Sequence, residues 1–103
     1  MAKLTLTASP TFKATVKIPV PGGKAAPVEF KFNGQTKDQF KAWLEKLADM
    51  EDLDALMEIV SGWDLEDPFN ADNVSQLLQS YVGAARVILE TYINEISAAR
   101  LGN

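Results

Sequence analysis

The first third of the chain alternates apolar and polar residues, which is the pattern of half-buried β-strands. Residues 12–18 and 28–33 each carry an apolar side chain at every second position. Three prolines and two glycines lie in the connection between the two segments. We therefore predict a β-hairpin over residues 12–33, and Leu4 and Leu6 are spaced to add a third short strand before it.

The register of this hairpin is predicted by matching apolar residues across the two strands. We expect Ile18 to lie opposite Val28 and Val16 opposite Phe30, joined by a three-residue tip at residues 22–24. Pairs of this kind stabilise the buried face of a sheet.

Charges on the outer face of the hairpin favour the same register. It places Lys17 opposite Glu29, whereas a register shifted by two residues would place Lys13 opposite Lys31. Opposite charges that face each other across two strands attract, and like charges repel. We therefore reject the shifted register and interpret the lysines as a solvated outer face.

After the hairpin, apolar residues recur at the three- and four-residue spacing of amphipathic helices. Thr36 and Gln39 fit a capping box, and Asn70 is a suitable N-cap for the third helix. Gly62 and Gly83 mark breaks between helices. The predicted apolar stripes are Phe40, Trp43, Leu44 and Leu47, then Leu53, Leu56, Met57 and Val60, then Val74, Leu77, Leu78 and Tyr81, and last Leu89, Tyr92, Ile93 and Ile96. The last helix has the widest apolar arc, so we expect it to be the most buried.

The predicted fold is α+β, with an N-terminal β-hairpin followed by a bundle of about four helices. At 103 residues, 47% of them hydrophobic, the chain has room for one core. We predict a single domain over residues 1–103, with the hairpin at 12–33 and the helical part at 36–101. The residues that we expect inside this core include Trp43, Leu56, Leu78 and Ile93.

The composition removes most catalytic chemistry. The chain has no Cys and no His, so it lacks thiol nucleophiles, disulfides and the commonest general base near neutral pH. The acids between Asp64 and Asp72 do not fit a calcium loop, because Pro68 and Ala71 interrupt the spacing. A hydrolase built on carboxylates and a metal would need buried facing acids, whereas these acids lie largely off the apolar stripes. We predict no enzyme activity, no cofactor and no metal.

Charge is divided unevenly along the chain. Residues 1–43 carry seven Lys and two acids, whereas residues 44–103 carry twelve acids and three basic residues. The acidic half argues against nucleic-acid binding and favours a basic protein surface as partner. The alternative is that two helices simply have solvated acidic faces. No signal peptide and no apolar run of membrane-spanning length occurs, so we expect no membrane association and a cytoplasmic location.

Residues 61–70 form the most unusual segment, because three large apolar side chains stand among polar ones in what we predict to be a loop. In one interpretation these side chains fill the gap between the second and third helices. In the other they are an exposed anchor for a protein partner, with acids beside them to steer it. The candidate partner-binding residues are Trp63, Asp64, Leu65, Glu66 and Phe69.

Several strings follow one another along nearly the whole chain. They are LTLT at residues 4–7, PTF at 10–12, VKIPVPGG at 16–23, VEFKF at 28–32, IVSGWDL at 59–65, FNADNVSQLL at 69–78 and YVGAA at 81–85. Together they resemble the small tail assembly chaperones of long-tailed bacteriophages and their prophages. None of these strings is a catalytic signature.

The resemblance implies a function. Such chaperones coat the helical tape-measure protein, keep it soluble and help to recruit tail-tube subunits, and they are absent from the mature virion. The implied partners are thus the tape-measure protein and the tail-tube protein, in the cytoplasm of the bacterial host, with self-association as a further expectation. Many are also made in a longer, frameshifted form, and this chain would be the short one. The alternative that the residues leave open is a small acidic inhibitor or immunity-type protein.

Overall fold

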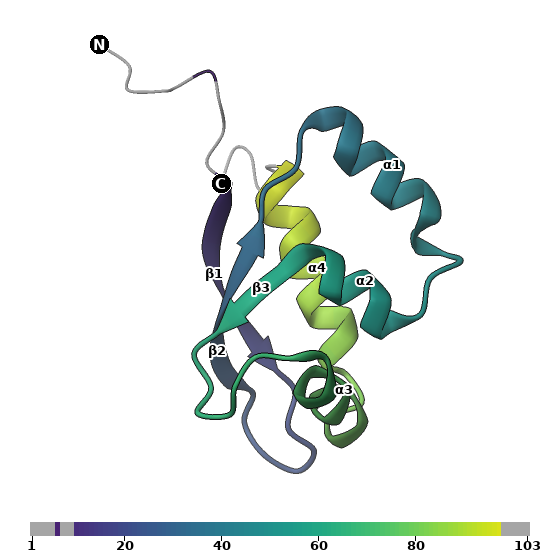
Figure 1. The fold of residues 1–103 in the computed structure, drawn as a ribbon. Coiled ribbons are helices and arrows are strands. Elements are labelled where there is room, and N and C mark those ends of the chain that lie inside the picture. The colour runs from purple at the N-terminus through teal and green to yellow at the C-terminus, as the bar shows by residue number, and fades with distance from the viewer. Residues whose placement is uncertain (1–5, 7–9, 98–103) are drawn as a thin grey trace.

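The computed structural model describes residue 6 and residues 10–97. Its elements are β1 (Thr11–Ile18), β2 (Ala26–Asn33), α1 (Lys37–Leu47), α2 (Asp52–Ile59), β3 (Val60–Trp63), α3 (Ala71–Ser80) and α4 (Ala84–Ser97). The strands form one layer and the helices lie together on one face of it (Figure 1). The predicted α+β fold, with a hairpin ahead of four helices, is confirmed.

The sheet is antiparallel, with β2 between β1 and β3. The prediction of a loop from residue 61 is wrong at its start, because Trp63 lies opposite Phe30 and Gly62 opposite Lys31 in a short third strand. This strand follows α2 directly rather than preceding the hairpin. Of the N-terminal strand that we expected, Leu4 lies outside the described residues, and Leu6, in a bend, is fully exposed.

The predicted register of the hairpin is wrong by two residues. The observed partners include Phe12 and Phe32, Lys13 and Lys31, Ala14 and Phe30, Thr15 and Glu29, Val16 and Val28, and Lys17 and Pro27. Both registers place the same side chains on the inner face, because they differ by an even number of residues. The buried face was therefore predicted correctly, and the expected pair of Lys17 with Glu29 was not.

Aromatic burial explains why the rejected register is the observed one. It sets Phe12 opposite Phe32, and their rings stack with centroids 5.5 Å apart. Burying a large apolar side chain contributes about 1.5–3 kcal/mol, whereas a facing pair of like charges costs less than about 1 kcal/mol. The packing of the partly buried Phe12 against the buried Phe32 therefore outweighs the repulsion between Lys13 and Lys31.

The connection between β1 and β2 is longer than the predicted tip. Within it, the Gly23 N–H donates a hydrogen bond to the Val20 carbonyl oxygen at 2.9 Å. Gly22 has a φ of 77°, the left-handed conformation that a type II turn requires after Pro21. The turn thus spans residues 20–23, and three more residues flank it inside the loop of residues 19–25.

The predicted helix caps are confirmed. At the start of α1, Thr36 Oγ1 accepts a hydrogen bond from the Gln39 N–H, and Gln39 Oε1 accepts one from the Thr36 N–H. Asn70 Oδ1 accepts a hydrogen bond from the Asn73 N–H at the start of α3. Residues 81–83 separate α3 from α4, and at Gly83 a Cβ would lie 3.1 Å from the Pro19 Cγ. The small residue lets this connection approach the hairpin loop.

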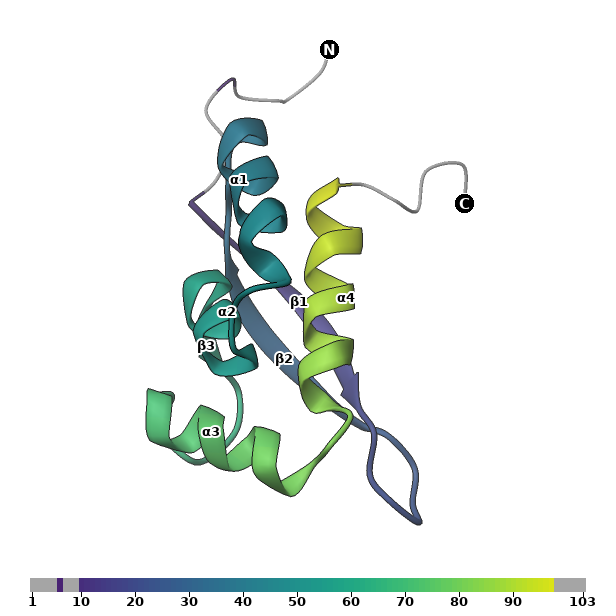
Figure 2. The same cartoon turned by 90° about the vertical axis from the view of Figure 1, so that its right-hand side faces the viewer.

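The core lies between the inner face of the sheet and the helices. α4 runs along the sheet, and α3 crosses near the start of α4 (Figure 2). Among the described helices α4 contributes the most buried residues, namely Ala84, Ala85, Ile88 and Tyr92, although the shorter α2 has a larger share of its residues buried. Trp43 and Leu56 are buried as predicted, whereas Leu78 and Ile93 are only partly buried. Among the described residues, no helix has the length and hydropathy needed to cross a bilayer.

Candidate partner-binding groove

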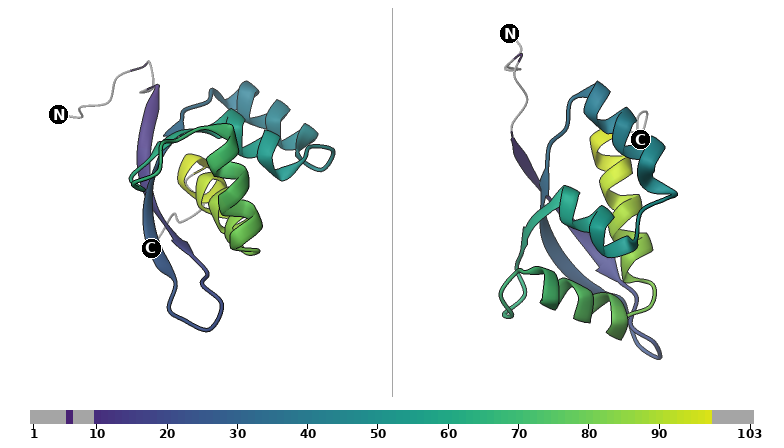
Figure 3. Two further views of the ribbon diagram at one scale, coloured as in Figure 1. Left: turned by 60° about the horizontal axis from the view of Figure 1, so that its bottom comes forward. Right: turned by 45° about the vertical axis from the view of Figure 1, so that its right-hand side comes forward.

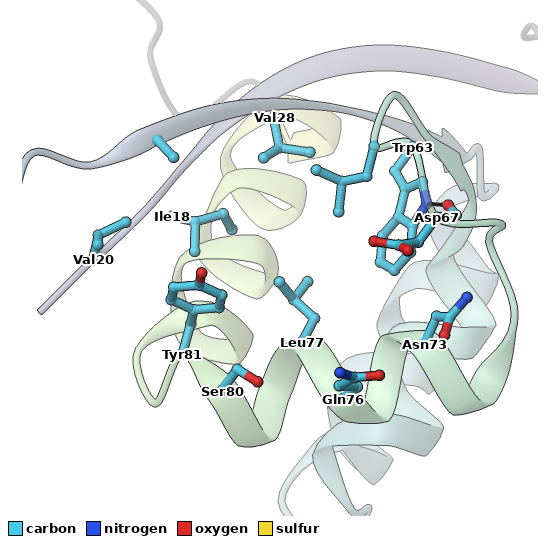
Figure 4. A pocket seen from close by; sticks show the side chains of 12 residues that line it. Ile18, Val20, Val28, Trp63, Asp67, Asn73, Gln76, Leu77, Ser80 and Tyr81 are labelled. Atoms are coloured by element: carbon cyan, nitrogen blue, oxygen red, sulfur yellow. Dashed lines mark hydrogen bonds between the residues drawn. The ribbon is translucent and has the colours of Figure 1, made fainter.

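A groove lies between the inner face of the hairpin and α3, at the end of the sheet nearest the hairpin loop (Figure 4). Its cavity volume is about 360 Å³. The side chains that line it are Ile18, Val20, Ala26, Val28, Trp63, Leu65, Asp67, Asn73, Gln76, Leu77, Ser80 and Tyr81. They come from both strands of the hairpin, from β3, from the segment after β3 and from α3, so the groove exists only in the folded chain.

One wall of the groove is a single face of α3. Asn73, Gln76, Leu77 and Ser80 recur at a spacing of three or four residues, which places them on one side of the helix, and Tyr81 follows at its C-cap. Over two turns this wall is about 12 Å long, at a rise of 1.5 Å per residue. It presents two apolar side chains among three polar ones, so a partner would find both contact area and hydrogen-bonding groups.

The opposite wall is the apolar inner face of the hairpin near its loop. Ile18 and Val28 are almost completely buried, and Val20 and Ala26 extend the surface toward the loop. The alternation of the strands turns these side chains inward, while the polar residues between them face solvent. This wall carries no charge.

The Trp63 side chain forms the end of the groove that lies farthest from the hairpin loop. Its indole Nε1–H donates a hydrogen bond to the backbone oxygen of Asp67 at 2.8 Å. The indole also lies edge-on to Phe69, with the ring centroids 5.2 Å apart. The segment after β3 is therefore folded around the indole, and the Asp67 carboxylate lines the groove beside it (Figure 4).

Residues 61–80 give this end of the molecule a negative charge. They contain four acids and no Lys or Arg. Among the described residues, no group of three or more His, Cys, Asp or Glu side chains is arranged to hold a metal ion. The groove is thus an apolar slot with polar edges and an acidic end, which suits apolar side chains of a partner that has basic residues nearby.

Comparison with known protein families identifies the family of this chain. The family model described as phage tail assembly chaperone matches residues 1–103, the whole length. The chain belongs to this family. Comparison with curated proteins and with solved structures found no match. A phage tail assembly chaperone acts in the host while tails are built and binds tail proteins, so the groove is a candidate for that contact.

Of the five candidate residues predicted from the sequence, the structure brings two to the groove. Trp63 and Leu65 line the groove, whereas Phe69 is partly buried and packs against the core and the Trp63 ring. Glu66 is exposed and does not line the groove. The segment thus packs against the core and also forms the edge of a groove.

Asp64 has a structural contact that the sequence did not predict. Its N–H donates a hydrogen bond to the Glu29 carbonyl oxygen at 3.1 Å, and its Oδ1 accepts one from the Glu29 N–H at 3.0 Å. These two bonds extend the pairing of β2 with β3 by one residue. Asp67, rather than Asp64, is therefore the acid that faces the groove.

Sequence reasoning assigned most of the groove to the core. Leu77 and Tyr81 belong to a predicted apolar stripe, and Ile18 and Val28 belong to the predicted buried face of the hairpin. The sequence around α3 did contain an indication of the groove, because Asn73, Gln76 and Ser80 lie on the same side as those two apolar residues. A mixed face of this kind indicates incomplete burial, although it does not reveal which strands lie opposite.

Proposed function

We propose that this chaperone binds the tape-measure protein through the groove and helps to recruit tail-tube subunits to it in the host cytoplasm. Family membership supports a contact with tail proteins. The observation that carries the proposal is the combination of apolar walls with an acidic end in a groove that is open in the folded chain. Because the chaperone acts during assembly, we expect it to be absent from the mature virion.

The partner segment that fits this groove is an amphipathic helix. A helix laid into a groove inserts apolar side chains at positions three or four residues apart. A cavity of about 360 Å³ takes a few such side chains, not a whole helix. A Lys or Arg one turn away would meet the carboxylate of Asp67. Long helical proteins offer many such stripes, so many copies of the chaperone can bind one partner.

Binding of this kind explains chaperone action without any chemistry. Exposed apolar stripes drive aggregation, and covering them removes that surface from water. The excess of acids in the chaperone gives the complex a net negative charge, and complexes of like charge repel one another. Because the hydrogen bond from Trp63 to Asp67 already fixes the edge of the groove, little ordering is needed on binding.

Two glutamines of α3 give a matched test of the groove. Gln76 and Gln79 are both exposed, but Gln76 lines the groove whereas Gln79 lies at a separate hollow toward the start of α2. We expect Gln76→Trp to obstruct the groove and to lower co-purification with the co-expressed tape-measure protein, and Gln79→Trp to leave it unchanged. Equal recovery of the tape-measure protein with both variants would exclude the groove. Failure of the wild-type chain to bind any tail protein would exclude the function.

The acidic end of the groove has its own test. Asp67→Lys reverses the charge in the groove but keeps the backbone oxygen that accepts the hydrogen bond from Trp63. We expect weaker binding of the tape-measure protein and a smaller dependence on salt than for the wild type. Glu66→Lys makes the same charge change outside the groove lining and serves as the control. An effect of equal size in both variants would assign the charge dependence to the whole loop instead.

A further inference from the structure

β1 forms one edge of the sheet, because β2 is its only neighbouring strand among the described residues. It has eight residues, whereas β3, at the other edge, has four. An edge strand presents a row of backbone N–H and C=O groups with which a further strand can pair. The helices all lie on the inner side of the sheet, so none of them covers its outer face (Figure 3).

The hydrogen bonds around the hairpin show which backbone groups of β1 face this open edge. In an antiparallel pair of strands, opposite residues alternate between hydrogen-bonded and non-bonded pairs. The Gly34 N–H donates to the Pro10 carbonyl oxygen at 2.9 Å, so the even-numbered residues of β1 are bonded to β2. Glu29, opposite Thr15, agrees with this, because its N–H and carbonyl oxygen both bond to Asp64 on the other side. The odd-numbered residues of β1 therefore direct their N–H and C=O groups to the open edge.

This edge combines three features that a bound strand could use. Lys13, Thr15 and Lys17 have no backbone hydrogen-bond partner within the described part of the chain. Their side chains are exposed on the outer face, and no ion pair joins either lysine to an acid there. On the inner face, Phe12 and Ala14 of the same strand are only partly buried. The edge thus offers hydrogen-bonding groups, positive charge on one face and apolar surface on the other.

We propose that β1 binds an extended segment of a partner protein as an additional strand, in which acidic residues alternate with apolar ones. The added strand would lie about 4.8 Å from β1 and would place its acids beside Lys13 and Lys17. Its apolar side chains would then lie beside Phe12 and Ala14. The lysines favour an acidic segment over a basic one, because like charges on neighbouring strands repel. The groove takes no part, so this inference goes beyond the proposed function.

Fluorescence anisotropy with a labelled synthetic peptide tests the contact. The probe is a peptide of alternating Glu and Val with blocked ends, matched in length to the eight residues of β1. The control peptide has Lys in place of every Glu. We expect the Glu peptide to bind and its binding to weaken as salt rises, whereas the Lys peptide should not bind. No binding of the Glu peptide, or equal binding of both peptides, would overturn the proposal.

Lys13 and Lys31 give a matched pair of variants, because they face each other across β1 and β2. Lys13→Glu and Lys31→Glu each turn this pair of like charges into a pair of opposite charges, and they change the net charge equally. Only Lys13 lies on the edge strand, and Lys31 is one strand farther from the bound peptide.

We expect Lys13→Glu to raise the dissociation constant of the Glu peptide about tenfold, and Lys31→Glu to raise it about twofold or less. Equal effects of the two variants would assign the binding to the outer face as a whole and would exclude pairing at the edge.

Thr15→Pro tests the backbone contact. Proline removes an N–H that points away from β2, so the sheet loses no hydrogen bond, and proline is tolerated on edge strands at such positions. We expect the variant to lose binding of the Glu peptide while its thermal unfolding midpoint stays close to that of the wild type. Full binding by this variant would show that the peptide does not pair with β1.

Amide hydrogen exchange on the wild-type chain gives a second measurement that does not depend on how the proline variant folds. With the Glu peptide bound, the N–H groups of Lys13, Thr15 and Lys17 should exchange about tenfold more slowly. Unchanged exchange at these three residues under saturating peptide would place the peptide elsewhere. None of these residues lines the groove, so binding of the tape-measure protein by the same variants reports on the proposed function separately.

Discussion

The inner face of the sheet is closed at one end and open at the other. At the closed end, Tyr92 of α4 is fully buried, and its ring centroid lies 5.3–6.3 Å from those of Phe12, Phe32, Phe40 and Trp43. Its hydroxyl donates a hydrogen bond to the Asn33 carbonyl oxygen at 2.8 Å. At the open end, the strands face the groove.

The difference lies in what covers each end. Five aromatic rings from β1, β2, α1 and α4 fill the closed end, and rings of this size bury the largest area per residue. At the open end Leu77 of α3 and Tyr81 at its C-cap stand among polar side chains, and Val20 and Ala26 of the opposite wall stay partly exposed. The molecule thus separates the end that stabilises the fold from the end that offers a surface for binding.

The largest expected effect comes from removing the ring at the centre of the closed end. Tyr92→Ala should lower the free energy of unfolding by about 3–5 kcal/mol, as for other buried aromatic residues. Trp63→Ala, at the partly buried edge of the groove, should cost about 1–3 kcal/mol and should also abolish binding of the tape-measure protein. Urea unfolding and pull-down on the same variants measure both quantities. A larger stability loss in Trp63→Ala than in Tyr92→Ala would reverse the comparison.

Two leucines extend the comparison to the helices. Leu56 of α2 is 1% exposed, whereas Leu78 of α3 is only partly buried. Leu56→Ala should cost about 2–5 kcal/mol, and Leu78→Ala about half as much, because less area is lost and the site stays open to water. Equal midpoints in urea unfolding would show that α3 is packed as tightly as α2.

Removing only the hydroxyl of Tyr92 should cost less, about 1 kcal/mol, because the Asn33 oxygen loses its donor. Burial raises the pKa of Tyr92 from 10.0 to about 12. Between these pH values the unfolded chain has released the proton and the folded chain still holds it, so the free energy of unfolding falls as pH rises. Urea unfolding at several pH values should therefore show the advantage of wild type over Tyr92→Phe narrowing from pH 10 toward 12. A constant difference would mean that the hydroxyl does not titrate as a buried group.

The smallest expected effect tests the space at the open end. Ala26 lines the groove from β2, and Ala26→Val adds apolar atoms there without crowding the core. We expect a gain of about 0.5 kcal/mol in unfolding free energy, since the added carbons are only partly covered and Val suits a strand. Binding of the tape-measure protein should weaken. A loss of stability in thermal unfolding would show that the groove is already filled.

The apolar pattern was sufficient for the hairpin and the four helices, and it failed for the third strand and for the exact pairing of the strands. The capping box at Thr36, the N-cap at Asn70 and the inward face of the hairpin all depend on neighbours within a few residues, and all were predicted correctly. The register was missed because it was judged from the charges of Lys17 and Glu29. In the fold, the stacking of Phe12 on Phe32 contributes more free energy than the attraction between those charges. The stacking energy in turn depends on the helix that covers both rings.

The candidate site was predicted in part for the same reason. Trp63 and Leu65 stood out because large apolar residues are unusual among acids and Pro. The roles of Asp64 and Asp67 could not be separated, because they depend on which strand lies beside the segment. The strand at residues 60–63 was missed since four residues carry too little periodicity to identify a strand.

The sequence by itself determined the fold class, the caps, the buried face of the hairpin, the absence of Cys and His chemistry, and the uneven charge. These properties follow from residue type and short-range spacing. Only the tertiary structure decided the register, the third strand and the groove, because each brings together residues far apart in the chain. The groove is the clearest case: its walls, near residues 18–28 and 73–81, are ordinary apolar stripes until the fold leaves them facing each other without filling the space between.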